Sequence, residues 1–217
     1  FKLFPIIKHF TKFDFYLTKL KLVKNRIYIF KELVKLFKAK RWISFYALAL
    51  PQVEGLFTEM CLIVNPEKDL SQKSLTHKVN IVKSSYSLNK SYFDYYQYYI
   101  PLQRNKFSHT GYDDDFKLKS YDLLVDLSHL LELFYEMDNP LVKITKLHSR
   151  KNGEDFMTLI DFIDYFKLLK GLHSSQIIII KDEIINFEKE FLIKECNITY
   201  ICYNILQEMP KLLTDII

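Results

Sequence analysis

The sequence has few residues that turn the chain sharply. Its 217 residues contain only four glycines and six prolines. Sandwiches and barrels depend on many tight turns, which these residues usually supply, so a many-stranded fold is disfavoured. Hydrophobic residues make up 49% of the chain and charged residues 26%, a balance typical of globular proteins with a buried core. We therefore expect an all-α protein, a bundle of helices joined by short polar links.

Cysteine is also scarce, and it lacks a useful pattern. The three cysteines, Cys61, Cys196 and Cys202, are odd in number and show no C-x-x-C spacing. Neither a disulfide framework nor a zinc site is expected from them. A reduced, cytoplasmic setting fits this usage, and no signal-peptide pattern opens the sequence.

No apolar run is uniform enough to predict a membrane span. The longest window, residues 45–64, contains Pro51, Gln52, Glu54 and Glu59. The sequence shows no glycine-rich phosphate loop, no Ser/His/Asp arrangement and no internal repeat. We therefore expect no cofactor, no metal and no membrane partner.

Charge is distributed unevenly along the chain. Residues 1–41 hold twelve lysines and arginines against two acidic residues, a net charge of +10, so the rest carries −5 of the total of +5. Such a basic segment suggests a polyanion partner such as RNA, and a solvated helix face is the alternative. The candidate RNA-binding residues in this segment are Lys19, Lys21, Lys24 and Arg26.

Two amphipathic or apolar stretches come before the middle of the chain. Residues 14–38 space their apolar side chains alternately by four and three, which predicts one helix that needs a partner surface. Residues 42–64 predict a buried helix interrupted near Pro51, because proline removes a backbone donor. Glu54 lies in this second stretch and needs either water or a cation. We favour a surface position for Glu54, with a pair to Arg104 as the alternative.

The chemistry-bearing residues gather in residues 104–109, which read R-N-K-F-S-H. Arginine offers a rigid fork of donors that suits a phosphate, histidine transfers protons near neutral pH, and asparagine can orient either. Lys106 adds a further cation for RNA. The helix before this segment carries tyrosines 92, 95, 96 and 99 on one face, where core packing is the simplest role. Together these residue types suit phosphodiester chemistry.

This segment resembles the HEPN family (higher eukaryotes and prokaryotes nucleotide-binding domain), all-helical proteins with an arginine, four to six residues and then a histidine, often as R-N-x-x-x-H. Arg104, Asn105 and His109 match that form, and the small residues Thr110-Gly111 follow it. The resemblance covers about residues 42–137. It implies a metal-independent endoribonuclease with a defence or toxin role, whose motifs from two protomers form one shared cleft.

The spacing of the motif sets a geometric condition. On one uninterrupted helix, Arg104 and His109 would point about 140° apart. A turn after Asn105, which Pro101 favours, or a second copy of the chain is needed to bring them together. We therefore expect a homodimer. An antitoxin or a larger defence complex is a further possible partner.

In the expected reaction, the 2′-hydroxyl of RNA attacks the neighbouring phosphate and leaves a 2′,3′-cyclic phosphate. His109 moves the proton, Arg104 holds the non-bridging oxygens, and Asn105 orients the cleft or the substrate. Two other classes stay open. One is a non-catalytic HEPN-like module that binds a nucleotide or a partner protein, and the other is a purely structural helical domain.

Three acidic residues, Asp113 to Asp115, follow the motif. We expect Asp114 or Asp115 to cap a helix at 116–137, with a metal site as the alternative. After a link at 138–153, the sequence predicts helices at 154–170, 174–194 and 197–207. The expected organisation is a basic helical arm at 1–41, a HEPN-like core at 42–137, and C-terminal helices at 138–217 that pack on the core.

Overall fold

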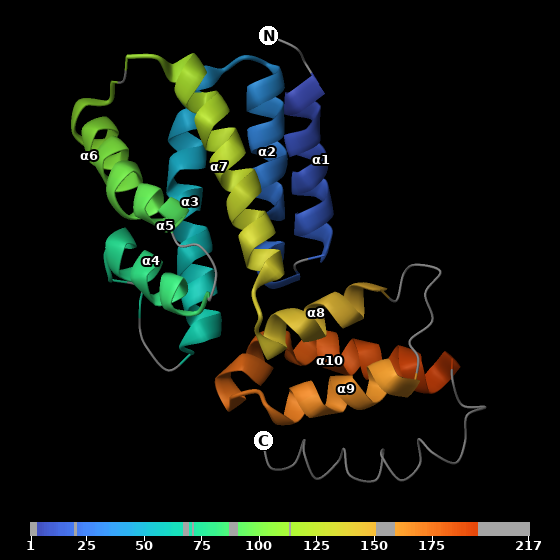
Figure 1. Cartoon of the computed structure of the whole chain (residues 1–217). Helices are drawn as coiled ribbons and strands as arrows, with labels where there is room; N and C mark the ends of the chain where they lie inside the picture. Colours follow the sequence, from blue (N-terminus) through green and yellow to red (C-terminus); the bar gives the residue numbers. More distant parts are fainter. Residues whose placement is uncertain are drawn as a thin grey trace.

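The structure is a computed structural model that describes residues 4–19, 21–66, 70, 72–86, 91–112, 114–150 and 159–194. Every regular element in these ranges is a helix, which confirms the all-α prediction. In Figure 1, α1 to α7 form a bundle, and α8 to α10 lie across its lower end. The elements are α1 Phe4–Lys19, η1 Lys21–Arg26, α2 Ile27–Lys38, α3 Trp42–Val64, α4 Leu75–Ser84, α5 Ser91–Asp94, η2 Tyr95–Tyr99, α6 Ile100–Thr110, α7 Phe116–Glu136, α8 Pro140–Arg150, α9 Leu159–Lys170 and α10 Ser174–Lys194.

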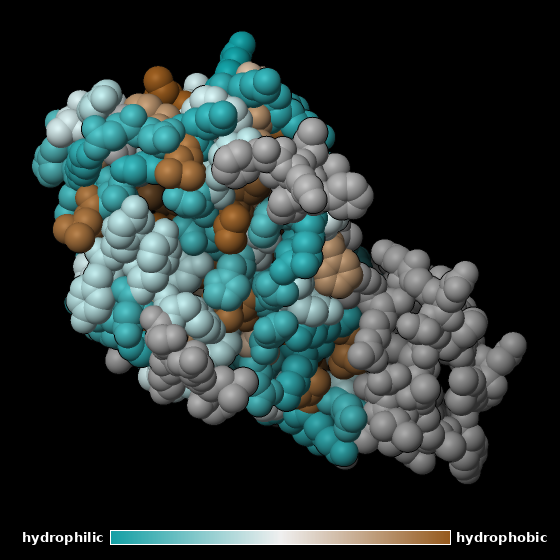
Figure 2. Space-filling view, turned by 45° about the horizontal axis from the view of Figure 1, so that its top comes forward, coloured by the Kyte–Doolittle hydropathy of each residue, from teal (hydrophilic) through white to brown (hydrophobic). Residues whose placement is uncertain are grey.

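Helix α3 is the centre of the bundle. It packs against α2, α4 and α7, and runs without a break across Pro51. Its length and composition would suffice to cross a membrane, yet half of its apolar window is buried against other helices. On the face that Figure 2 shows, hydrophobic side chains are scattered among hydrophilic ones. Both observations are consistent with a soluble protein.

The single helix predicted for residues 14–38 is wrong, because the chain turns back within it. The turn is η1, where Val23 has non-helical angles of φ −103° and ψ 16°. Folding back places Phe13 of α1 edge-on against Phe30 of α2, with ring centroids 5.2 Å apart. Both halves of the apolar stripe thereby reach one core, which a straight helix could not achieve. The predicted basic arm is thus packed on the bundle, with α1 against α7 and α2 against α3.

A tight turn joins α2 to α3. Lys40 adopts a left-handed conformation with φ 57°, and the Arg41 N–H donates to the Leu36 carbonyl over 3.0 Å. This conformation usually belongs to glycine and costs a residue with a Cβ about 1 kcal/mol. The turn allows α3 to run back alongside α2 (Figure 1).

Helical structure continues from Ser91 to Thr110 through α5, η2 and α6, and η2 is a π-helical turn. Pro101 lies in the first turn of α6 and has no N–H to give to the Gln97 carbonyl four residues earlier. The Thr76 hydroxyl of α4 donates to that carbonyl instead, over 3.1 Å. Proline is therefore accommodated. Helix α6 continues past Asn105, so of the two ways to bring Arg104 and His109 together the turn is absent.

The C-terminal half combines confirmed and corrected predictions. Helix α7 begins at Phe116, and the Asp115 carboxylate accepts from the Leu118 N–H over 2.9 Å, as the cap prediction required. The link predicted at 138–153 contains α8, so that prediction is wrong. Helices α9 and α10 lie within or at the predicted ranges, whereas the helix predicted at 197–207 falls outside the described residues.

Candidate functional site

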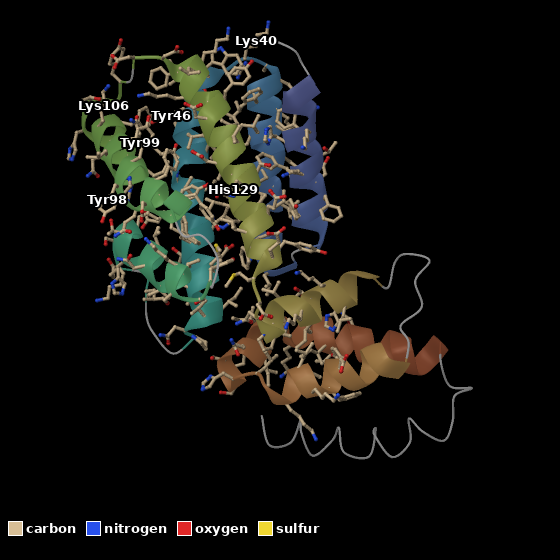
Figure 3. The ribbon with its side chains drawn as sticks, in the orientation of Figure 1. Lys40, Tyr46, Tyr98, Tyr99, Lys106 and His129 are labelled. Atoms are coloured by element: carbon tan, nitrogen blue, oxygen red, sulfur yellow. The ribbon has the colours of Figure 1, made fainter. Side chains whose placement is uncertain are left out.

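The motif residues lie along α6, on the outside of the bundle. Arg104, Asn105, Lys106 and His109 are all exposed. In Figure 3, Lys106 projects away from the bundle at the outer end of α6. Helix α6 ends at Thr110 and is followed by Gly111, whose positive φ of 64° suits glycine and whose N–H donates to the Phe107 carbonyl over 2.8 Å. The polar residues of the motif are thus available to a ligand.

Glu54 of α3 holds the arginine of the motif. Arg104 donates from Nη1 to Glu54 Oε2 over 2.5 Å, and Lys78 donates from Nζ to Glu54 Oε1 over 3.0 Å. The Glu54 side chain is 22% exposed, so it does not simply emerge at the surface as we favoured from the sequence. The alternative, a pair with Arg104, is what the structure contains.

Within one chain, Arg104 and His109 do not converge. Both lie on the continuous helix α6, five residues apart, so their side chains leave the helix about 140° apart. Arg104 lies on the side that faces α3, because it bonds Glu54. A single protomer therefore does not offer both groups to one phosphate from the same direction.

His109 belongs to a different, solvent-facing stripe. Tyr98, Leu102, Asn105 and His109 follow one another at spacings of four, three and four, which places them on one side of the helix. Tyr98 is 63% exposed and Leu102 67% exposed. In Figure 3, Tyr98 points outward from the bundle. Two large apolar side chains thus share a face with the histidine.

The basic residues that the sequence proposed for RNA binding have different surroundings. Arg26 is only 21% exposed and donates to Glu59 Oε1 over 2.6 Å and to Gln52 Oε1 over 2.7 Å. Its guanidinium is therefore engaged inside the bundle and poorly placed for a phosphate. Lys106 is paired with Asp114 over 2.9 Å at the surface. The side chains of Lys19, Lys21 and Lys24 lie outside the described residues.

Two of the three acidic residues after the motif have structural partners. Asp115 caps α7, Asp114 pairs with Lys106, and Asp113 lies outside the described residues. Within the part of the chain that the structure describes, no group of three or more histidine, cysteine, aspartate or glutamate side chains could hold a metal ion.

Sequence reasoning missed the carboxylate at the back of the tyrosine face. Asp126 of α7 accepts from the Tyr95 hydroxyl over 2.9 Å, and its backbone carbonyl accepts from Tyr96 over 3.3 Å. Burial, and to a lesser degree the neighbouring Asp122, raise the pKa of Asp126 to about 7, while the bond from Tyr95 opposes the rise. The only signal in the sequence was the position of Asp126 on its own helix. Such spacing does not predict which residues of another helix it contacts.

A small cleft runs between η2–α6 and α7 next to this carboxylate. It is partly open to solvent and holds little free space. Tyr99 stacks on Tyr95 at its edge, with ring centroids 4.9 Å apart. Lys119 donates to Gln103 Oε1 over 2.9 Å at one end. Figure 3 shows Tyr99 and Tyr46 on the side of α6 that faces the bundle. This cleft adjoins the motif helix but does not contain Arg104 or His109.

No family model, no curated protein and no solved structure matches this chain. The function is therefore inferred from the residues of the site.

Proposed function

We propose that this protein is a metal-independent endoribonuclease that acts as a homodimer. The observation that supports this most strongly is the state of Arg104, which Glu54 orients while half of its side chain stays open to solvent. An oriented, accessible guanidinium suits a phosphate. Arg104 lies five residues before the exposed His109 on the same helix, in an R-N-x-x-x-H motif that resembles the HEPN family.

In the proposed reaction, His109 removes the proton from the 2′-hydroxyl that precedes the scissile phosphate, and the oxygen attacks the phosphorus. The bond to the 5′-oxygen breaks, that oxygen takes up a proton from water, and a 2′,3′-cyclic phosphate and a 5′-hydroxyl form. Arg104 stabilises the charge that builds on the non-bridging oxygens, and Asn105 orients the substrate. DNA has no 2′-hydroxyl and is not cleaved.

A homodimer would bring together the side chains of Arg104 and His109, which point apart within one chain. A two-fold axis along the exposed side of α6 brings the His109 of one protomer near the Arg104 of its partner. Tyr98 and Leu102, on the same stripe as His109, supply apolar surface to bury there. RNA is the substrate, the cytoplasm is the setting, and an antitoxin or defence complex would restrain the activity.

The first experiment incubates purified protein with total RNA in the presence of a chelator. Wild type, Arg104→Ala and His109→Ala are compared with His77→Ala, a matched control because His77 is also exposed but lies on α4. We expect cleavage by wild type and control, and a loss of at least about 100-fold in the two motif variants. Full activity in either folded motif variant contradicts the proposal. RNA binding without cleavage by wild type would favour a non-catalytic module.

A second experiment tests the shared site. Arg104→Ala and His109→Ala chains are mixed in equal amounts and allowed to exchange. Half of the dimers are then mixed, and each holds one intact arginine and histidine from different chains, so roughly a quarter of wild-type activity should return. A monomer in light scattering that cleaves RNA at full rate rules the dimer out.

A further inference from the structure

The partner of Glu54 inside the bundle is an unusual lysine. The Lys78 side chain is only 3% exposed, and its ammonium donates to Glu54 Oε1 over 3.0 Å. Lysine is almost never buried without a partner, because desolvating a charge costs several kcal/mol. A neutral side chain of the same length would fill this space between α3 and α4 without the free-energy cost of desolvating a charge. The charge of Lys78 therefore needs an explanation beyond packing.

Glu54 connects this buried cation to an accessible one. Each of its two oxygens accepts a hydrogen bond from one cation, Oε1 from Lys78 and Oε2 from Arg104. Side-chain exposure rises along the chain of contacts, from 3% for Lys78 through 22% for Glu54 to 50% for Arg104. The three side chains thus reach from the interior to the surface of α6.

The net charge of the three groups decides what Arg104 can bind. Arg104 and Glu54 alone would form a neutral pair, and the carboxylate would compete with a phosphate for the guanidinium. The ammonium of Lys78 offsets the carboxylate, so the three groups together carry +1. Arg104 then keeps its orientation and also a net attraction for an anion.

We propose that Lys78 is a positioning residue for phosphate recognition, which balances Glu54 so that Arg104 meets a phosphate oxygen as an oriented cation. The inference rests on the proposed function only in taking RNA as the source of that phosphate. Inorganic phosphate offers the same oxygen chemistry. The two sources can therefore be tested separately.

The test uses substitutions that keep the shape of the interior. Lys78→Met removes the buried charge and leaves Glu54 paired with Arg104. Lys78→Met combined with Glu54→Gln removes both charges, so no unmatched carboxylate faces Arg104. Lys83→Met is the matched control, since Lys83 lies on the same helix and pairs with Asp94 instead.

The first arm measures how far inorganic phosphate slows the modification of Arg104 by phenylglyoxal, followed by peptide mass spectrometry. We expect protection in the wild type and in Lys83→Met. The protection should fall about 5- to 10-fold in Lys78→Met and return in the double variant. A purely structural lysine would not give this recovery. Equal protection in wild type and Lys78→Met, or no recovery in a folded double variant, overturns the inference.

The second arm measures the affinity for single-stranded RNA over a range of salt in a His109→Ala background, where the RNA stays intact. Lys78→Met should weaken binding about 5- to 10-fold at low salt and reduce the salt slope by about one. If phosphate protection depends on Lys78 but RNA does not bind, the proposed function fails and the inference stands. If RNA binds equally with and without Lys78, the inference fails and the proposed function stands.

Discussion

Two arginines contact opposite sides of α3, and each pairs with a glutamate of that helix. Arg26 lies in η1, is 21% exposed, and bonds both Glu59 and Gln52. Arg104 lies in α6, is 50% exposed, and bonds Glu54. The same pair of residue types thus serves a closed contact on one side and an accessible one on the other.

The glutamates show why the two contacts differ. Glu54 has a cation on each oxygen. Glu59 has Arg26 on Oε1, whereas its Oε2 is buried with no hydrogen-bond partner in the described part of the chain. Burial raises the pKa of Glu59, and Arg26 works against that rise. Arg26 is therefore needed to stabilise the charge of the buried Glu59 carboxylate. Arg104 is accessible enough to bind a ligand as well as Glu54.

The largest difference should appear when each arginine is replaced by methionine. Arg26→Met leaves Glu59 without its cation, and we expect a loss of about 2 to 3 kcal/mol in the free energy of unfolding. Arg104→Met should cost less than about 1 kcal/mol, because the pair is half exposed and Glu54 keeps Lys78. Urea denaturation of both variants measures this. Equal losses would remove the distinction between the two sides.

The second largest effect should be a change in the pH dependence of stability that comes from Glu59. The pKa of Glu59 is raised in the folded state, so that state keeps its proton as the pH rises above the unfolded value of 4.5. Stability therefore falls through this window and stays lower above it. Removing Arg26 raises the folded pKa further and should enlarge the fall by on the order of 1 kcal/mol. Arg26→Met is compared with Arg26→Met/Glu59→Gln in denaturation from pH 4 to 8. A fall of the same size in both variants would exclude Glu59 as its source.

A smaller effect is expected at Gly55, where the guanidinium of Arg26 occupies the space that a Cβ would need. A Cβ there would lie 2.5 Å from Cζ and Nη2 of Arg26. Gly55→Ala should cost about 1 kcal/mol in the wild type, because the guanidinium must leave its two partners. In the Arg26→Met background the same change should stabilise the helix by up to about 1 kcal/mol. The two denaturation midpoints should thus move in opposite directions, and a shift of one sign in both backgrounds would refute the contact.

The smallest change should follow Lys106→Met, at the rim of the accessible side. Its pair with Asp114 is exposed, with side chains 42% and 76% accessible. We expect a change in unfolding free energy within about 0.5 kcal/mol. RNA affinity should drop only slightly, with the salt slope lower by about one if Lys106 contacts a phosphate. An unchanged slope would leave Lys106 outside the RNA contact.

The features that local rules control were predictable from the sequence. Helix α7 follows from its apolar spacing, and its start follows from the capping aspartate at Asp115. The fold-back at η1 was not predictable, since the 4-3 stripe is equally good for one helix or two. Helix α8 was missed because its apolar residues fall in a segment that reads as polar overall.

The candidate site was predictable only in part. Arg104, Asn105 and His109 stood out because their chemistry is concentrated in six residues. The contact between Arg104 and Glu54 spans fifty residues of sequence, and periodicity carries no information on such pairs. Lys78 looked like any other lysine, because its burial results from the packing of α4 on α3.

The π-helical turn at Tyr95–Tyr99 has a consequence for the register of α6. Such a turn closes hydrogen bonds five residues apart, where an α-helix closes them four apart, so it accommodates one extra residue in an otherwise regular helix. An extra residue in a plain α-helix would rotate everything beyond it by about 100°, and the wider turn absorbs that rotation. Arg104 thus keeps the side of α6 that faces Glu54. Loss of one residue from this turn should return the segment to α-helix and leave Arg104 facing Glu54.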